Sequence, residues 1–132
     1  MNGPRELTFF TDRDLGHRFA QLLLDAGVRV ERHDDHFQPT TPDDEWIAAV
    51  ASRGWVALTR DARIPYSPLA LGVLKQSKAR LFVLVGKLTT TDAAGVFLKR
   101  RTRIERLAET EPAPFIAKVR RDGVKVWVRF NK

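Results

Sequence analysis

The sequence has 132 residues and carries a net charge of +7 at pH 7, with 43% hydrophobic and 30% charged residues. This length and composition suit a globular protein with a real core, and we expect residues 1–132 to form a single domain. Because the chain has no cysteine, no run of 18 apolar residues and no signal-peptide pattern, we expect a cytoplasmic protein without disulfides, thiolate metal sites or a membrane partner.

The charge is unevenly distributed along the chain. Residues 1–66 contain 8 basic and 11 acidic residues, a net charge of −3, whereas residues 67–132 contain 15 basic and 5 acidic residues, a net charge of +10. An acidic half joined to a basic half indicates a division of labour, in which one part holds cations and the other holds an anionic partner.

Short apolar runs alternate with amphipathic segments along the chain. We expect strands at residues 7–10, 28–30, 55–59 and 80–85. We expect helices at about residues 16–26, from the N-cap Thr41 to Gly54, at about residues 69–76, and, as one long helix, from residues 89–92 to the prolines at 112 and 114. This alternation predicts a three-layer α/β/α fold with a mainly parallel sheet.

Residues 115–130 form two further alternating segments, which predict a C-terminal β-hairpin. Asp122-Gly123 between them is a two-residue turn of the type that favours I′ geometry. This turn sets the expected cross-strand pairs: Val119 with Val126, Ala117 with Val128 and Phe115 with Phe130 on the apolar face, and Arg120 with Lys125, Lys118 with Trp127 and Ile116 with Arg129 on the other.

Acidic residues follow the predicted strands or open a predicted helix. Asp12 and Asp14 come after the first strand, Asp61 comes after the third, and Asp43, Asp44 and Glu45 open the second helix. Ligands of open α/β sheets bind beyond the carboxyl ends of the strands, so we expect all six acids near one edge. Carboxylates brought together repel one another, and Mg²⁺ or Mn²⁺ removes that penalty. The pattern therefore predicts a metal-dependent nuclease site with these six acids as candidate ligands.

The acids also have structural explanations. An Asp at a strand end often forms a turn, and acids in the first turn of a helix interact favourably with its dipole. His33-Asp34-Asp35-His36 resembles a chelating motif, but we interpret it as a polar loop because its histidines lack helical spacing.

The basic half contains two groups of cations. Arg100, Arg103 and Arg106 recur every three residues and share a stripe of the predicted long helix, which suits either RNA or a solvated face. Trp127 stands among hairpin cations, where it could stack on a base, pack on the helix or face an acidic protein. Our candidate RNA-binding residues are Arg13, Arg60, Arg63, Arg100, Arg103, Lys118, Arg120, Lys125, Trp127 and Arg129.

The stretch TPDDEW (residues 41–46), followed by RGWVALTRDARI (residues 53–64), resembles the PIN-like domains, in particular the VapC-like toxin branch. FTDRDLG (residues 10–16) extends the similarity, which covers most of the chain. The resemblance implies a Mg²⁺- or Mn²⁺-dependent ribonuclease of toxin–antitoxin type, often inhibited by a cognate antitoxin and often dimeric. It also implies that Asp12, Asp43 and Asp61 are the catalytic acids, with Asp44 or Glu45 as an alternative to Asp43 and Asp14 as an extra candidate.

The sequence departs from the PIN-like pattern after Asp61. PIN domains commonly have a further acid after the third strand, but no Asp or Glu occurs between Asp61 and Asp92. Two alternatives remain. One is a receiver-like phosphoacceptor. Its arrangement is imitated by the pair Asp12 and Asp14 after the first strand, by Asp61 after the third strand and by Lys87 after the fourth. The other is a non-catalytic RNA- or protein-binding module with the PIN-like fold.

Overall fold

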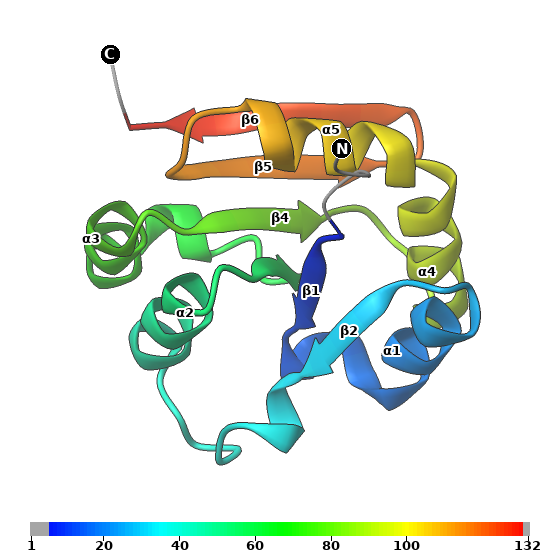
Figure 1. The fold of residues 1–132 in the computed structure, drawn as a ribbon, viewed down its shortest axis with the longest axis horizontal. Helices are drawn as coiled ribbons and strands as arrows, with labels where there is room; N and C mark the ends of the chain where they lie inside the picture. Colours follow the sequence, from blue (N-terminus) through cyan, green and yellow to red (C-terminus); the bar gives the residue numbers. More distant parts are fainter. Residues whose placement is uncertain (1–5, 131–132) are drawn as a thin grey trace.

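A six-stranded sheet runs through the middle of the molecule (Figure 1). In the computed structural model, which describes residues 6–130, its strands are β1 (Thr8–Thr11), β2 (Arg29–Arg32), β3 (Val56–Thr59), β4 (Arg80–Leu84), β5 (Phe115–Arg120) and β6 (Gly123–Arg129). They stand in the order β2-β1-β3-β4-β5-β6, and all neighbours are parallel except β5 and β6. The predicted mainly parallel sheet with a C-terminal hairpin is therefore confirmed.

Helices cover both faces of the sheet. One layer contains α1 (Gly16–Asp25), α4 (Thr90–Lys99) and α5 (Arg101–Thr110), and the other contains α2 (Asp43–Ser52) and α3 (Pro68–Ser77) (Figure 1). Short 3₁₀ helices lie at Arg13–Leu15 (η1), His33–Asp35 (η2) and Ile64–Tyr66 (η3). Across residues 6–130, every helix is too short or too polar to cross a membrane.

Each strand supplies side chains to two separate cores. Phe9 and Phe10 are both fully buried on β1, but Phe9 belongs to the core under α1, α4 and α5, and Phe10 belongs to the core under α2 and α3. Successive residues of a strand point to opposite faces of the sheet. A strand covered on both faces therefore needs a continuous apolar run, which explains the fully buried run Val56–Leu58.

The ends of several helices follow from their sequence. Gly27 after α1 and Gly54 after α2 have φ values of +86° and +74°, which side chains rarely tolerate. The side chain of Thr89 caps α4 by accepting a hydrogen bond from the Asp92 N–H at 3.0 Å. The predicted N-cap Thr41 is wrong, because Pro42 is extended and directly precedes the first residue of α2.

The predicted long helix near the C-terminus is instead two helices. Arg100 lies between α4 and α5 and leaves regular helical geometry, with φ −98° and ψ 9°. Its guanidinium donates to the backbone carbonyl of Arg121, with an Nε–O distance of 3.1 Å. This contact joins the helix break to the hairpin turn, so Arg100 does not share one helical stripe with Arg103 and Arg106 as expected.

The hairpin is present, but its predicted register is wrong. The turn is Arg121-Asp122, one residue earlier than expected, so Arg120 pairs with Gly123. A bulge next to Ile116 and Ala117 leaves Trp127 as the extra residue of β6. The observed pairs are Phe115 with Arg129, Ile116 with Val128, Ala117 with Val126, Lys118 with Lys125, and Val119 with Val124.

Candidate active site

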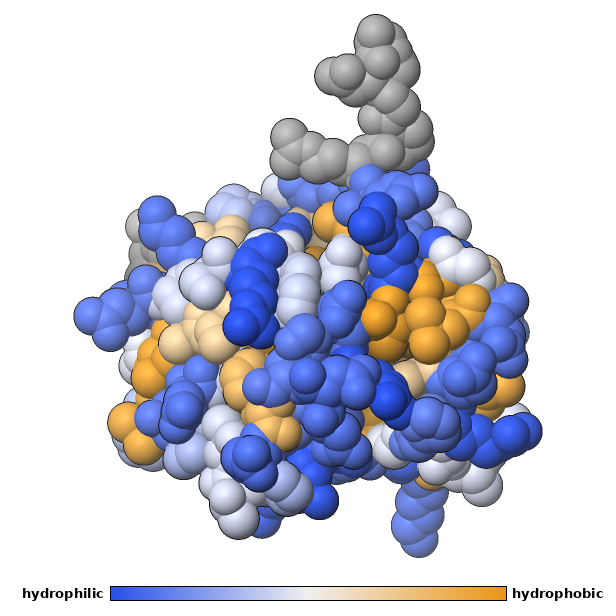
Figure 2. All heavy atoms as spheres, turned by 60° about the horizontal axis from the view of Figure 1, so that its bottom comes forward, coloured by the Kyte–Doolittle hydropathy of each residue, from blue (hydrophilic) through white to orange (hydrophobic). Residues whose placement is uncertain are grey.

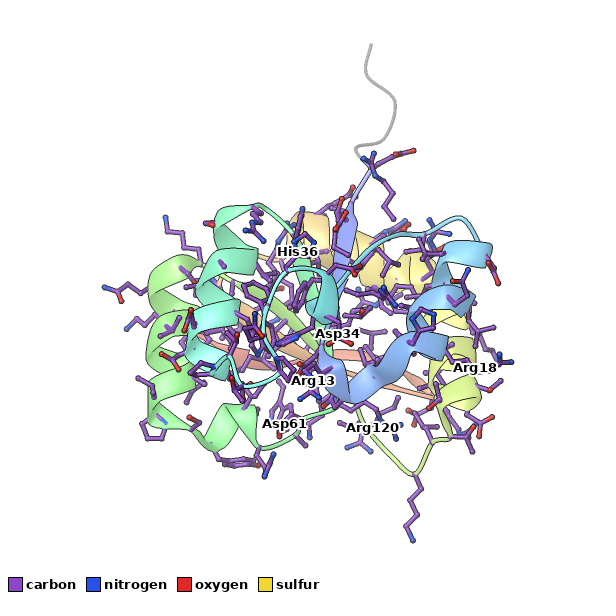
Figure 3. The ribbon with its side chains drawn as sticks, turned by 90° about the horizontal axis from the view of Figure 1, so that it is seen from below. Arg13, Arg18, Asp34, His36, Asp61 and Arg120 are labelled. Atoms are coloured by element: carbon purple, nitrogen blue, oxygen red, sulfur yellow. The ribbon has the colours of Figure 1, made fainter. Side chains whose placement is uncertain are left out.

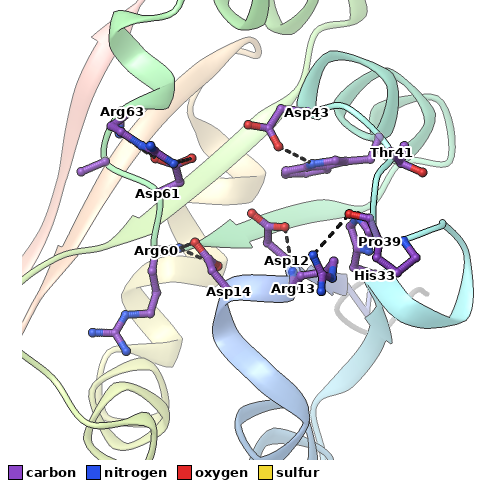
Figure 4. A pocket seen from close by; sticks show the side chains of 12 residues that line it. Asp12, Arg13, Asp14, His33, Pro39, Thr41, Asp43, Arg60, Asp61 and Arg63 are labelled. Atoms are coloured by element: carbon purple, nitrogen blue, oxygen red, sulfur yellow. Dashed lines mark hydrogen bonds and ion pairs between the residues drawn. The ribbon is translucent and has the colours of Figure 1, made fainter.

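The sheet order reverses between β1 and β3. From β1 the chain passes to β2 on one side, and it then returns to place β3 on the other side of β1. Ligands of open α/β sheets bind beyond the carboxyl ends of the strands at such a switch point. Asp12 follows β1 and Thr59 ends β3, so both residues lie at this point. A pocket of about 700 Å³ opens here (Figure 4).

The pocket brings together residues that are far apart in the sequence. Two of the six predicted acids, Asp44 and Glu45, stand in the first turn of α2 and do not line the pocket. The lining contains the other four acids, three candidate RNA-binding arginines and a histidine, namely Asp12, Asp14, Asp43, Asp61, Arg13, Arg60, Arg63 and His33.

Asp12 and Asp14 meet at the hydroxyl group of Thr59. The Oγ1 atom of Thr59 lies 2.7 Å from Oδ2 of Asp12 and 3.2 Å from Oδ2 of Asp14. A hydroxyl has one hydrogen to donate, so the two carboxylates compete for it. Backbone N–H groups supply further donors, from Arg13 to Asp12 at 2.7 Å and from Arg60 to Asp14 at 3.1 Å. Thr59 lies outside the predicted set of site residues, although it directly precedes Arg60 and Asp61 in the sequence.

The acid pair has strongly perturbed protonation. The pKa of Asp12 is raised to about 7, mainly by burial and then by the negative charge of Asp14, while the hydrogen bond from Thr59 opposes the shift. The pKa of Asp14 is also raised, again mainly by burial. A nearby divalent cation would favour the ionised form of both groups. The two shifts therefore indicate that the pair is suited to an additional positive charge.

Asp61 binds the arginine two residues after it (Figure 4). Its Oδ1 atom accepts hydrogen bonds from Nε and the backbone N–H of Arg63, both at 2.9 Å, and its Oδ2 atom accepts one from Nη2 at 3.2 Å. These bonds hold the pKa of Asp61 below its usual range. The Arg63 side chain is 91% exposed, so solvent screens this ion pair and it opens at little cost.

Asp43 is positioned from the core of the protein. Its Oδ1 atom accepts a hydrogen bond of 2.9 Å from the indole N–H of Trp46, one helical turn later. Trp46 is buried and stacks on Phe10, with 5.2 Å between the ring centroids. Of the three acids that open α2, Asp43 is the one that lines the pocket, and Trp46 is the reason that its carboxylate is held there.

His33 lies in a buried environment that the sequence analysis did not anticipate. Residues 33–35 form η2 rather than an irregular loop, and His33 is only 2% exposed, with Phe10 and Phe37 beside it. Burial lowers its pKa. Within residues 6–130, its Nδ1 atom is buried without a hydrogen-bond partner. A polar His-Asp-Asp-His segment carries no signal for this burial, which depends on packing against β1.

The oxygen donors in the pocket suit a hard divalent cation. Carboxylate and hydroxyl oxygens are ligands that Mg²⁺ and Mn²⁺ prefer. Nevertheless, in the part of the chain that the structure describes, no three His, Asp or Glu side chains lie close enough to hold a metal ion. Asp12 and Asp14 already lie together, whereas Asp43 and Asp61 are engaged by Trp46 and an arginine. The donor chemistry fits, and rearrangement of Asp43 or Asp61 would complete the set.

The candidate RNA-binding residues come from several elements of the fold. Figure 3 shows Arg13, Asp61 and Arg120 on three different segments, and hydrophilic residues cover most of the face in Figure 2. Arg103 stands on α5, in the layer opposite to α3. Arg129 is engaged in an ion pair of 2.8 Å with Glu111. The other candidates are Arg13, Arg60 and Arg63 at the pocket, Arg100 at the helix break, and Lys118, Arg120, Lys125 and Trp127 on the hairpin.

The chain is an α/β protein with an acidic pocket at the switch point of its sheet. A family model described as a PIN like domain matches residues 7–86, which include all four acids of the pocket. The chain therefore belongs to the PIN-like domain family, whose members are commonly nucleases. The comparisons with curated proteins and with solved structures found no match. The family match favours a nuclease-type site over the receiver-like alternative.

Proposed function

We propose that this chain is a Mg²⁺- or Mn²⁺-dependent endoribonuclease of toxin–antitoxin type, from the VapC-like branch of the PIN-like domains. One observation carries the proposal. Asp12 and Asp14 converge on the Thr59 hydroxyl at the switch point of the sheet, and burial raises the pKa of Asp12 to about 7. Two acids held against their mutual repulsion are stabilised by a divalent cation.

The acids of the pocket would hold this cation. Asp12 and Asp14 provide the two carboxylates that already lie together, with Asp43 and Asp61 as the additional donors. When bound, the cation would polarise a phosphodiester and lower the pKa of a water molecule. The Thr59 hydroxyl orients the Asp12 carboxylate, and the Trp46 indole holds Asp43 at the pocket.

The arginines of the pocket suit the phosphate groups of RNA. Arg60 is held in place, because its Nη2 atom donates to the carbonyl of Leu88 at 2.8 Å and its backbone N–H donates to Asp14. Opening the exposed Arg63–Asp61 ion pair would release a carboxylate for the cation and a guanidinium for a phosphate. On the resemblance alone, we also propose a cognate antitoxin, a homodimer and a cytoplasmic location.

Asp12→Asn and Asp61→Asn test the proposed activity. RNA cleavage with Mg²⁺ is measured for both variants, the unaltered protein and the control Asp25→Asn, whose exposed acid on α1 is bonded to Gln21. We expect both site variants to lose at least about 100-fold in rate, beyond the 10- to 100-fold typical of an outer-shell partner, and the control to keep its rate.

Two outcomes would contradict this assignment. Undiminished cleavage by both site variants would remove these acids from the mechanism. Tight RNA binding by the unaltered protein, without cleavage under any divalent metal, would instead identify a non-catalytic RNA-binding module.

A further inference from the structure

Tyr66 is an aromatic residue outside the predicted set of site residues. Among the large hydrophobic residues that the structure describes, it is the most exposed, at 76%. It ends η3, and its backbone N–H donates to the carbonyl of the pocket residue Arg63 at 2.9 Å. Burial in the core does not explain this ring, which lies one short turn from the acidic pocket.

The hairpin supports the ring of Tyr66 from one side. Tyr66 packs edge-to-face on Trp127, with 6.2 Å between centroids and 73° between planes. Trp127 is the extra residue of the β6 bulge, and the Nζ atom of Lys118 lies 4.0 Å from its ring centroid. The ammonium group therefore occupies one face of the indole. Tyr66 offers the more accessible ring, and Trp127, the expected base-stacking residue, supports it.

Lys118, which contacts Trp127, belongs to a group of hairpin cations. Lys118 lies directly opposite Lys125 in the hairpin, and both lysines, together with Arg120, line a pocket of about 570 Å³. Like charges placed opposite each other are destabilising in a sheet. A polyanion bound along this face would relieve the repulsion. Asp122 is the acid in the lining of this pocket.

We propose that Tyr66, supported by Trp127, stacks on an unpaired base of single-stranded RNA while Lys118 and Lys125 hold neighbouring phosphates. Stacking on a protein ring requires a base that is free of its duplex neighbours, so this site selects single-stranded over double-stranded RNA. The inference rests on the proposed function for its choice of substrate, because η3 connects Tyr66 to the pocket in which the phosphodiester would bind.

The charge of this surface favours RNA over a protein partner. Tyr66 and Leu69 are both exposed, and an apolar partner could cover such a pair. However, the ammonium group of Lys118 lies over the ring of Trp127, which contacts Tyr66. Lys125 lies opposite Lys118 in the hairpin. Phosphates and a base match this mixture of cations and aromatic rings better than an apolar surface does.

RNA binding without divalent metal tests this inference independently of cleavage. The affinity for a short fluorescent single-stranded RNA is measured in EDTA for the unaltered protein, Tyr66→Ala, Tyr66→Trp and the control Leu69→Ala, whose apolar side chain is 64% exposed. We expect Tyr66→Ala to weaken binding by about 5- to 150-fold, the range for loss of one stacked base. Tyr66→Trp retains an aromatic ring and should bind like the unaltered protein, as should Leu69→Ala.

A second RNA and a second variant separate the possible failures. A duplex of the same sequence should bind the unaltered protein and Tyr66→Ala equally, and the surface variant Asp25→Asn should retain the affinity of the unaltered protein for the single strand. Equal affinity of Tyr66→Ala and the unaltered protein for single-stranded RNA would overturn the inference and leave the proposed cleavage intact. Loss of self-association in Tyr66→Ala, with unchanged RNA affinity, would also overturn it and mark this face as a protein interface.

Discussion

The carboxyl group of Asp12 links the stability of the protein to pH. Burial raises its native pKa to about 7 from an ordinary value of 3.8. Between these two values the native state binds a proton that the unfolded chain has released. Stability from this group is therefore fully present below about pH 4 and is lost as the pH rises through 7.

Asp12→Asn should remove this dependence, because an amide does not ionise. The difference in free energy of unfolding, variant minus unaltered protein, should increase from pH 4 to pH 8. The increase should be on the order of 4 kcal/mol for a pKa shift of this size. Urea denaturation in EDTA at several pH values measures the difference, and Asp25→Asn serves as the surface control. A constant difference in unfolding free energy from pH 4 to pH 8 would contradict the raised pKa.

The site acids were predictable as residues, but their partners were not. A carboxylate after an apolar strand is visible in the sequence, as Asp12 and Asp61 show. Thr59 joins Asp12 across 47 positions of the chain, and this contact exists only because β1 and β3 are neighbours. The burial of His33 likewise depends on packing against aromatic residues of other segments.

At the scale of elements, the hairpin contains a destabilising pair of like charges on a surface suited to anions. Lys118 and Lys125 face each other directly, whereas the predicted register pairs Arg120 with Lys125. The like-charge pair therefore exists but involves a different residue. The turn position and the bulge at Trp127 decide this register, and alternation of residue types within one strand does not reveal either feature.

Lys125→Glu should separate the stability of the hairpin from its binding of RNA. The variant places opposite charges across β5 and β6, so its free energy of unfolding should be about 0.2–1 kcal/mol higher than that of the unaltered protein. It should also bind single-stranded RNA more weakly. The slope of the logarithm of the binding constant against the logarithm of salt concentration should become shallower, by the amount expected for about one phosphate contact. Urea denaturation and binding titrations at several salt concentrations measure the two effects.

Arg106→Glu is the matched control for this charge reversal. It changes the net charge equally but lies on α5, in the layer opposite to α3. It should leave RNA affinity close to that of the unaltered protein. Equal losses in the two variants would show that affinity follows net charge rather than the hairpin surface.

At the scale of the whole molecule, the order of the strands creates the pocket. Four acids, from the segments after β1 and β3 and from the start of α2, reach one edge because the sheet reverses between β1 and β3. Asp43 and Asp61 have other partners, and in residues 6–130 no three ligand side chains form a metal cluster. Binding of a cation at this site is therefore expected to stabilise the whole fold and to rearrange these acids.

Metal-linked thermal unfolding measures this coupling without any substrate. At 100 times its dissociation constant, Mn²⁺ should stabilise the unaltered protein by about 2.7 kcal/mol, which corresponds to a rise in Tm on the order of 10 °C. Asp12→Asn should lose most of this rise, and Asp25→Asn should keep it. An equal rise in Asp12→Asn would place the bound metal at another site.

The sequence by itself determined the order of strands and helices, the parallel character of the sheet and the edge at which the acids gather. These features follow from short-range periodicity, from glycine at helix ends and from the rule that parallel strands release their ends at one edge. Only the tertiary structure decided the break at Arg100, the hairpin register, the hydroxyl shared by Asp12 and Asp14, and the exposed ring of Tyr66. Each of these depends on contacts or packing between segments far apart in the chain, which local sequence patterns do not encode.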